Sequence, residues 1–254
     1  MGKLLNKNAI VTSGGQGIGK EIAFELIRQG CNVAVSYYSS REGADEVISF
    51  ARENNRRAEA FKADVTCEQD CVDLVKNSVS YLGGLDILVN NAGSLVKRCW
   101  LEDMTTEFWN NIFNINMTSM MVITREAVPH LSKAADGASI VNLSSLAGRK
   151  GGHAGSLAYG TAKGAVLTWT RALAAELGPM GIRVNALAPG LILGTSFHST
   201  HTTPESAKQT ISQIPIGRAG NPSDIARAAT YFASEYDGFI SGATLDINGG
   251  VYCA

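Results

Sequence analysis

The chain has 254 residues, and its 22 Lys and Arg against 23 Asp and Glu give a formal net charge of −1. This balance argues against a nucleic-acid-binding protein, which would hold phosphates through a basic surface. With 45% hydrophobic and 18% charged residues, the chain can bury a large core, which excludes disorder as its main state and fits one α/β domain.

The amino-terminal segment and the cysteines indicate a cytoplasmic protein. Residues 1–8 are polar and lead straight into an apolar run, without the apolar core of a signal peptide. No run of about 18 apolar residues occurs, so we expect no membrane span. The five cysteines form no Cys-x-x-Cys motif, and no further ligand lies near Cys67 and Cys71. We therefore expect reduced thiols and no metal site.

Short apolar runs alternate along the chain with longer segments of helical character. The expected strands are 9–12, 32–36, 59–62, 87–90, 139–143, 183–187 and 244–247. The expected helices are 19–28, 44–54, 69–81, 106–132, 159–177 and 223–233. Because the strands are apolar at nearly every position, the pattern predicts an α/β fold, a parallel sheet with helices on both faces, in one domain over residues 1–254.

A glycine-rich turn, Thr12–Gly19, follows the first expected strand and leads into helix formers from Lys20. Glycine at such a turn lets the backbone approach a pyrophosphate, and the helix N-terminus offers free N–H groups. The turn therefore predicts a dinucleotide site, with a purely structural tight turn as the alternative.

The end of the second expected strand should meet the adenosine ribose. It reads Ser36–Arg41 and has no acidic residue before Glu42, whereas an acidic residue here is typical of enzymes that prefer NAD. Small hydroxyl groups and Arg41 would suit a 2′-phosphate, because a guanidinium can bind it through two hydrogen bonds. The sequence thus favours NADPH, with NADH as the second candidate; alternatively, Arg41 simply begins the next helix.

Tyr159 and Lys163 lie four residues apart in an expected helix that follows the strand ending at Ser144–Ser145. On one helix face, the ammonium can stabilise the phenolate and so lower the tyrosine pKa from about 10. Ser145 could hold a substrate oxygen within reach of the phenol. Taken alone, this spacing is that of an ordinary helix pair.

The least patterned stretch is 190–213, which is rich in Thr, Ser and His. A polar insertion of this length in a compact α/β domain is often a mobile element, so we expect a substrate lid here. A solvated surface loop is the alternative.

The chain carries these motifs in order: Thr12-x-Gly14-x-x-Gly17-Ile18-Gly19, Asp64-Val65, Asn90-Asn91-Ala92-Gly93, Asn116, Ser145, Tyr159-x-x-x-Lys163 and Pro189-Gly190. This order closely resembles the short-chain dehydrogenase/reductase family over essentially the whole chain. The resemblance implies a single Rossmann-type domain with a seven-stranded parallel sheet. It also implies NAD(P)-dependent hydride transfer at a carbonyl or secondary alcohol, usually in a homotetramer.

Matched residue by residue, the resemblance implies four catalytic residues. Tyr159 resembles the general acid/base, and Lys163 the residue that lowers its pKa and binds the nicotinamide ribose. Ser145 matches the substrate-oxygen donor and is preferred to Ser144, because Ser145–Gly148 meets the family pattern Ser-x-x-Gly. Asn116 matches the asparagine that kinks a helix and anchors a water of the proton relay.

The cofactor site follows from the same match. Asp64 and Val65 match residues that contact the adenine, and residues 91–93 match the segment that lines the adenosine ribose. Pro189–Gly190 matches the segment whose backbone contacts the nicotinamide. Ile192 matches the residue that contacts the nicotinamide carboxamide. The predicted cofactor-binding residues are Ser13, Gly14, Gln16, Gly17, Ile18, Tyr37, Ser39, Arg41, Asp64, Val65, Asn91, Ala92, Gly93, Tyr159, Lys163, Pro189, Gly190 and Ile192.

Two positions depart from the family pattern. Ser13 replaces the first glycine of the turn, so the backbone there is expected to differ a little. Thr195 lies one position later than the family's cofactor-binding threonine, with Gly194 in its place, and is left outside the predicted set.

The substrate is indicated by basic and polar residues near the expected mouth of the site. The predicted substrate residues are Arg98, Arg149, Lys150 and His153, with Lys97, His198 and His201 nearby. Such a rim suits a small anionic keto-sugar acid, although each group could be a solvated surface charge. Segments 90–98 and 151–156 resemble the family's sugar-acid reductases, including those acting on 4-deoxy-5-hexoseulose uronate.

That substrate is therefore the first expectation. A 3-oxoacyl thioester (acyl-carrier-protein) reductase is the enzymatic alternative, and a non-catalytic NADPH-sensing regulator is the alternative from another class. No nucleic acid or membrane partner is expected.

Overall fold

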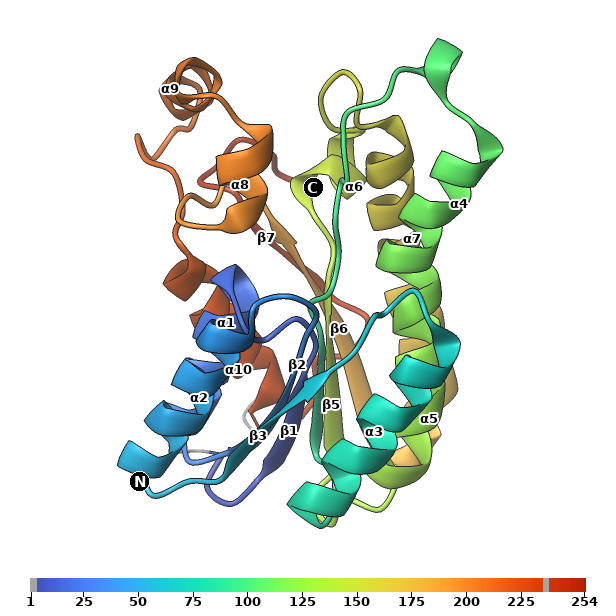
Figure 1. Ribbon diagram of the computed structural model, residues 1–254, viewed down its shortest axis with the longest axis vertical. Coiled ribbons are helices and arrows are strands. Elements are labelled where there is room, and N and C mark those ends of the chain that lie inside the picture. Colours follow the sequence, from blue (N-terminus) through green and yellow to red (C-terminus); the bar gives the residue numbers. More distant parts are fainter. Residues whose placement is uncertain (1–3, 235–237) are drawn as a thin grey trace.

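The computed structural model describes residues 4–234 and 238–254, and a seven-stranded parallel sheet runs through the centre of these residues (Figure 1). The first three residues of the expected polar start thus lie outside the described part. The strands are β1 (Asn8–Val11), β2 (Asn32–Tyr37), β3 (Ala58–Lys62), β4 (Ile87–Asn90), β5 (Ala138–Leu143), β6 (Ile182–Pro189) and β7 (Thr244–Ile247). Their order in the sheet is β3-β2-β1-β4-β5-β6-β7. The order reverses between β1 and β4, which is where such sheets bind ligands at their carboxyl ends.

Helices cover both faces of the sheet, which explains why the strands are apolar throughout. On one face lie α1 (Gly17–Arg28), α2 (Arg41–Glu53) and α10 (Pro222–Ala233), and on the other α3 (Glu68–Leu82), α5 (Ser119–Leu131) and α7 (Leu157–Leu177) (Figure 1). Every residue of β5 is buried, and alternate residues of β1, β2, β4 and β5 join two hydrophobic clusters, one under each helical layer. The predicted Rossmann-type fold is confirmed.

The expected helix 106–132 is interrupted. It consists of α4 (Thr106–Phe113), a π-helical turn (Asn114–Thr118) and α5. Within the turn, the Asn116 side chain donates to the carbonyl oxygen of Ile112, at 2.9 Å. This wider turn is the kink that the resemblance implied at Asn116. Short 3₁₀ turns lie at Leu101–Asp103 and Gly178–Met180.

Three short helices lie above the carboxyl ends of the strands: α6 (Leu146–Lys150), α8 (Ser196–His201) and α9 (Pro204–Ser212) (Figure 1). The stretch 190–213, the least patterned part of the sequence, therefore contains two helices that the sequence did not predict. The hydroxyl groups of Thr195 and Thr203 cap α8 and α9 by accepting the N–H groups of His198 and Ser206. N-terminal capping of this kind stabilises short helices that propensity alone would leave marginal.

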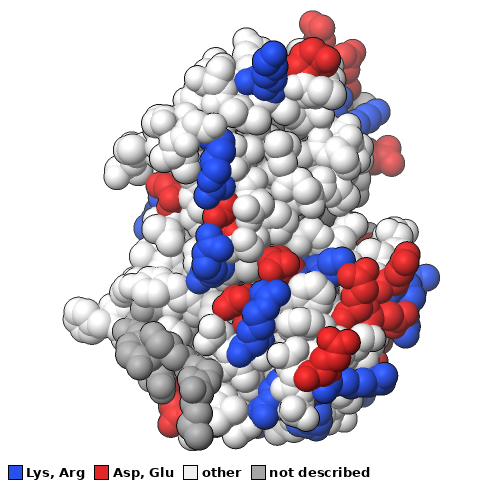
Figure 2. Space-filling model, turned by 90° about the vertical axis from the view of Figure 1, so that its left-hand side faces the viewer, with Lys and Arg blue, Asp and Glu red and all other residues white. Residues whose placement is uncertain are grey.

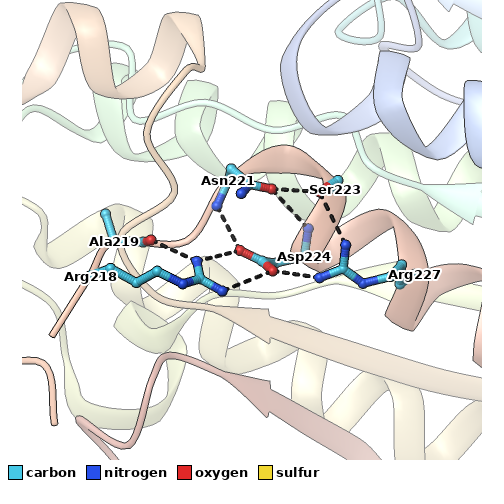
Figure 3. A network of polar contacts seen from close by, with 6 residues as sticks. All are labelled: Arg218, Ala219, Asn221, Ser223, Asp224 and Arg227. Atoms are coloured by element: carbon cyan, nitrogen blue, oxygen red, sulfur yellow. Dashed lines mark hydrogen bonds and ion pairs between the residues drawn. The ribbon is translucent and has the colours of Figure 1, made fainter. Parts of the chain in front are cut away.

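The α8–α9 segment leaves the body of the protein and returns to it at one place. The Gly220 carbonyl accepts the Leu193 N–H at 3.0 Å, and the Gly220 N–H donates to the Leu191 carbonyl at 2.9 Å. A network of polar contacts around Asp224 follows immediately (Figure 3). Its carboxylate accepts hydrogen bonds from Arg218 at 2.8 and 3.2 Å and from Arg227 at 2.6 Å. The return point is thus fixed.

Charged side chains are mixed in sign on the surface. On the face drawn in Figure 2, basic and acidic residues are interspersed, as the near-zero net charge suggests. Ion pairs such as Lys20–Glu46 and Arg28–Glu21 are part of this pattern. No helix among the described residues is both long and apolar enough to cross a membrane.

Candidate active site

The glycine-rich turn joins β1 to α1 in a backbone path that places Ser13 at φ +51°, in the left-handed region. Its N–H donates to the Ser36 hydroxyl on β2 at 2.9 Å. Gly14 lies against β2, because an added Cβ would be 2.6 Å from a Val35 methyl carbon. Ser13 thus adopts the conformation for which glycine is preferred, at a cost in strain.

The segment after β4 is joined to the glycine-rich turn through Thr12. The Thr12 hydroxyl accepts the N–H groups of Asn91 and Ala92, each at 2.9 Å. The Asn91 amide in turn donates to the Thr12 carbonyl at 2.9 Å. These bonds hold the two segments on either side of the point where the strand order reverses.

Ser144 and Ser145 follow β5 and have different surroundings. The Ser144 hydroxyl is buried and donates to the Lys163 carbonyl at 2.7 Å. The Ser145 hydroxyl caps α6 by accepting the Ala147 N–H at 3.1 Å, and Ser145 lines the central cavity. Ser144 also lines the cavity, but its hydroxyl proton is donated to α7, so Ser145 is the serine whose hydroxyl can donate to a ligand.

Tyr159 and Lys163 lie on successive turns of α7 and both reach the cavity. The Lys163 ammonium donates to the Leu143 carbonyl at 2.8 Å and lies 5.9 Å from the centre of the Tyr159 ring. Burial raises the pKa of Tyr159 to about 12, although a hydrogen bond with Ser145 acts in the opposite direction. Burial lowers the pKa of Lys163 to about 8. The lowered tyrosine pKa expected from sequence is therefore not found, and the phenol is protonated at neutral pH.

Asn116 is fully buried and joins the π-helical turn to the segment after β4. Its side chain accepts the Ser94 N–H at 3.1 Å and donates to the Ser94 carbonyl at 2.8 Å. A Cβ at Gly93 would lie 2.7 Å from the Asn116 amide oxygen and 2.8 Å from the Lys163 ammonium. Asn116 does not line the cavity itself, but its amide and Lys163 both lie against Gly93.

The central cavity has a volume of about 270 Å³ and is bounded by α6, α7, α8 and the ends of the strands. It brings together eleven of the predicted cofactor residues: Ser13, Gln16, Gly17, Ile18, Asn91, Gly93, Tyr159, Lys163, Pro189, Gly190 and Ile192. Thr195, which the sequence left outside the set, also lines it and packs beside Gly17.

The other predicted cofactor residues do not line this cavity. They are Gly14, Tyr37, Ser39, Arg41, Asp64, Val65 and Ala92. Arg41 is 57% exposed and pairs with Asp45 at 2.8 Å, while it also donates to the Tyr37 hydroxyl at 3.1 Å. The Asp64 carboxylate accepts the N–H and hydroxyl of Thr66 and so shapes a turn.

Three of the four predicted substrate residues, Arg98, Lys150 and His153, line the cavity. Arg149 is the exception, because its guanidinium pairs with Asp246 on β7 at 3.0 Å and points away from the cavity. This corrects the sequence interpretation of Arg149. The Arg98 guanidinium donates to the carbonyl oxygens of Ala154 at 2.8 Å and His201 at 3.3 Å. It thereby joins the loop after α6 to the end of α8.

Helix α8 forms the opposite wall with an aromatic cluster. The Phe197 ring lies 5.6 Å from the Tyr159 ring and is flanked by the rings of His198 and His201 at 5.1 and 5.2 Å. Burial, with His201 nearby, lowers the pKa of His198 to about 4. Burial, Lys150 and Arg98 also lower the pKa of His153. Sequence reasoning noted the two histidines of α8 but missed Phe197, whose role depends on the fold of the segment.

The cavity wall is cationic. No Asp or Glu occurs among the described residues that line it, whereas the charged and titratable side chains there include Arg98, Lys150, Lys163, His153, His198 and His201. The lowered histidine pKa values follow first from burial, and neighbouring positive charges add to the effect, since both disfavour the protonated imidazole. A bound anion would reverse that effect.

Comparisons with known proteins agree with this architecture. The family model described as enoyl-(acyl carrier protein) reductase matches residues 13–252. A 3-oxoacyl-(acyl-carrier-protein) reductase of Staphylococcus aureus is 35% identical over 248 residues, which cover 98% of this chain and 99% of the relative.

Two solved structures are similar over nearly their whole length. An NADH-dependent reductase, A1-R′, responsible for alginate metabolism has a TM-score of 0.91 and 30% identity, with both chains covered completely. A short-chain dehydrogenase from Burkholderia cenocepacia in complex with NADP has a TM-score of 0.90 and 32% identity, with 98% and 99% covered. The chain belongs to the short-chain dehydrogenase/reductase family. It is accordingly an NAD(P)-dependent oxidoreductase.

Proposed function

We propose that this protein reduces a small keto-sugar acid, such as 4-deoxy-5-hexoseulose uronate, and that it prefers NADPH to NADH. The observation that carries the proposal is the cationic cavity wall, in which Arg98, Lys150 and Lys163 line the space beside Tyr159 with no lining carboxylate among the described residues. Such a wall favours a substrate carboxylate and disfavours neutral substrates.

The residues present fit a nicotinamide dinucleotide. The turn before α1 has no side chain at Gly17, and the free N–H groups at the start of this helix suit a pyrophosphate. Gly93 leaves room between Asn116 and Lys163, where a Cβ would collide with both. When bound, the nicotinamide supplies the hydride for the carbonyl carbon.

The proposed roles of the chain's own residues follow from their protonation and contacts. Tyr159, protonated at neutral pH, donates the phenolic proton to the carbonyl oxygen. Ser145 donates a hydrogen bond to the same oxygen and orients it. Lys163 holds its ammonium beside the phenol, where it stabilises the anion as the proton leaves, and Asn116 supports the path that resupplies it.

The structure places Arg41 at the first position of α2, four residues after the end of β2. The proposed preference for NADPH rests on this guanidinium and on the lack of an acidic residue between β2 and Glu42. The Arg41–Asp45 pair is exposed, and exposed ion pairs contribute little to stability, so a 2′-phosphate can compete for the guanidinium. Among the similar structures, one is described as an NADP complex and another as an NADH-dependent reductase. Asp64, Val65, Tyr37 and Ser39 complete the proposed adenosine side of the site.

We also propose that α8 and α9 form the substrate lid. The base of the segment is fixed by the Gly220 contacts, while Phe197 and the histidines of α8 rest on the catalytic side of the cavity. Arg98 joins the end of α8 to the loop after α6. Opening this contact would admit the substrate, and closing it would exclude water from Tyr159.

A cytoplasmic homotetramer is part of the proposal. Several large apolar side chains are exposed, among them Trp100, Leu101 and Leu157, and Leu245 lies on the edge strand β7. Exposed apolar residues and a free sheet edge are features that association would cover. Light scattering should then give four times the chain mass.

A 3-oxoacyl thioester reductase is the second candidate. The matching family model and the Staphylococcus aureus relative are both described as reductases of groups on the acyl carrier protein. Loss of reduced-nicotinamide absorbance with the keto-uronate, measured beside acetoacetyl thioester, separates the two. Faster turnover of the keto acid is expected, and faster turnover of the thioester would reassign the substrate. A purely NADPH-sensing regulator is disfavoured by the family assignment and would consume cofactor with neither compound.

A further inference from the structure

Arg149 and Asp246 form an ion pair that the proposed reaction does not use directly. Their closest atoms, Nε and a carboxylate oxygen, are 3.0 Å apart, and the side chains are only 15% and 18% exposed. A second guanidinium nitrogen of Arg149 donates to the Thr244 carbonyl at 3.4 Å. Both contacts are made to β7, so they fix α6 to the edge strand of the sheet.

Helix α6 lies between this anchor and the proposed catalytic residues. At its N-terminus, Ser145 is the cap, and its hydroxyl accepts the Ala147 N–H while its carbonyl accepts the Gly148 N–H at 2.9 Å. On its other side, α6 packs directly on the backbone of α7, since a Cβ at Gly148 would lie 2.6 Å from the carbonyl group of Lys163. A shift of α6 would therefore move the Ser145 hydroxyl relative to Tyr159.

We propose that Arg149 is a positioning residue, held by Asp246, that fixes α6 and through it the orientation of the Ser145 hydroxyl. The inference rests on the proposed function, because it takes from it the role of Ser145 in holding the substrate oxygen. Lys150, the next residue, lines the cavity and is exposed, so the two adjacent cations have separate tasks. Lys150 faces the ligand, and Arg149 faces the sheet.

The pair also explains why the position needs a guanidinium. Arg149 bonds a carboxylate and a carbonyl from different nitrogen atoms, whereas lysine has a single ammonium and cannot reproduce both contacts at the same geometry. Removing either partner leaves the other charge in a largely buried place without compensation. The Arg149→Gln and Asp246→Ala variants should thus have the same effect on α6.

The experiment compares Arg149→Gln, Arg149→Lys, Asp246→Ala and the Gln/Ala double variant with Lys7→Gln. Lys7 is the control, because it pairs with Asp86 at a similar exposure, 20% and 18%, and with the exposed Asp136, at the opposite end of the sheet. Steady-state kinetics use whichever of the keto acid and the acetoacetyl thioester the wild type reduces. NADPH dissociation constants and thermal midpoints are measured for each variant.

Arg149→Gln and Asp246→Ala should each lower kcat about tenfold with NADPH affinity within about twofold of wild type. The double variant should be no worse than either single variant, because both remove one contact. Arg149→Lys should recover part of kcat. Lys7→Gln should lose thermal stability without loss of kcat.

Unchanged kcat in Arg149→Gln and Asp246→Ala, with a loss of stability like that of Lys7→Gln, would overturn the proposal. So would an additive loss in the double variant. If the wild type reduces neither compound, the proposed function fails, and hydrogen exchange then tests the anchor by itself. Residues 144–151 should exchange faster in Arg149→Gln but not in Lys7→Gln, and equal exchange would overturn the anchor.

Discussion

At the scale of single residues, burial determines the protonation of the proposed catalytic pair. The pKa of Tyr159 is raised to about 12 and that of Lys163 is lowered to about 8 by the same removal from water. At pH 7 the phenol therefore carries its proton and the lysine remains largely charged. This combination suits proton donation to a carbonyl oxygen, the direction of reduction.

Replacing Tyr159 by Phe removes the proton donor but keeps the ring that packs against Phe197. We expect kcat to fall by about 10³-fold, within the range of general acid catalysis, and NADPH affinity to stay within about twofold. Stopped-flow turnover and a fluorescence titration with NADPH measure the two quantities. Retained turnover in this variant would rule out Tyr159 as the acid.

Ser13 gives a second prediction at this scale, because it lies at φ +51° without a hydrogen bond from its own side chain among the described contacts. Ser13→Gly should relieve backbone strain of about 1–2 kcal/mol in the folded protein. The greater conformational entropy of glycine in the unfolded chain should offset roughly half of that gain in stability. Urea unfolding should therefore show a gain of about 0.5–1 kcal/mol. A destabilised variant would show that the serine side chain has a structural role.

At the scale of elements, α10 begins with a capping box in which Asn221 and Asp224 satisfy each other's backbone N–H groups (Figure 3). The Arg218 guanidinium is the main cause that lowers the pKa of Asp224 to about 2. A carboxylate whose pKa is lower in the folded protein stabilises it above the unfolded value of about 4, and this contribution disappears as the pH falls toward 2.

Asp224→Asn should therefore lower the free energy of unfolding by about 1–2 kcal/mol at pH 6, and the difference from wild type should shrink between pH 4 and 2. Urea unfolding at a series of pH values measures it. A difference that stays constant down to pH 2 would mean that the charge of Asp224 contributes nothing. Arg227→Gln, whose guanidinium is the more exposed of the two partners, serves as a milder comparison.

The elements with a strong apolar period could be predicted from the sequence, and those defined by distant contacts could not. All seven strands and the long helices lie within a few residues of their expected places, because strands buried on both faces leave a continuous apolar signal. Helices α8 and α9 were missed, although Thr203 followed by Pro204 is a local helix-start signal that could have indicated α9. The π-helical turn depends on Ser94, far away in sequence, and no local pattern reports it.

The site shows the same division. Motif spacing predicts which residues meet at the cavity, and Ser145, Tyr159 and Lys163 do meet there. The direction in which Arg149 points could not be predicted, because its partner Asp246 lies on β7, almost a hundred residues later. Likewise, the hydrogen bond from the Lys163 ammonium to the Leu143 carbonyl is a result of tertiary packing.

At the scale of the whole molecule, the cationic wall is assembled from four segments: the loop after β4, helix α6 with the following loop, α7 and α8. The pKa values of His153, His198 and His201 are all lowered, by burial first and by neighbouring cations next. A bound carboxylate stabilises the protonated imidazole and so raises the histidine pKa. Substrate binding should therefore be accompanied by protonation of these histidines at a pH above their pKa in the free protein.

The KM for the keto acid should thus decrease as the pH falls from about 6.5, the reference pKa of histidine, toward about 4, the pKa of His198 in the free protein. His198→Gln and His201→Gln should flatten this dependence. Identical pH profiles for KM in the wild type and both variants would show that these histidines do not contribute to substrate binding.

The central claim is that the cavity recognises a carboxylate beside the carbonyl to be reduced. The most direct test compares kcat/KM for the keto-uronate with kcat/KM for its methyl ester. Both are measured with NADPH, in the wild type and in Lys150→Gln. The two compounds share the carbonyl and differ in charge. We expect the wild type to prefer the acid by at least about tenfold, the worth of one charge-assisted hydrogen bond, and Lys150→Gln to lose most of that preference. Equal kcat/KM for the acid and the ester in the wild type would contradict the account.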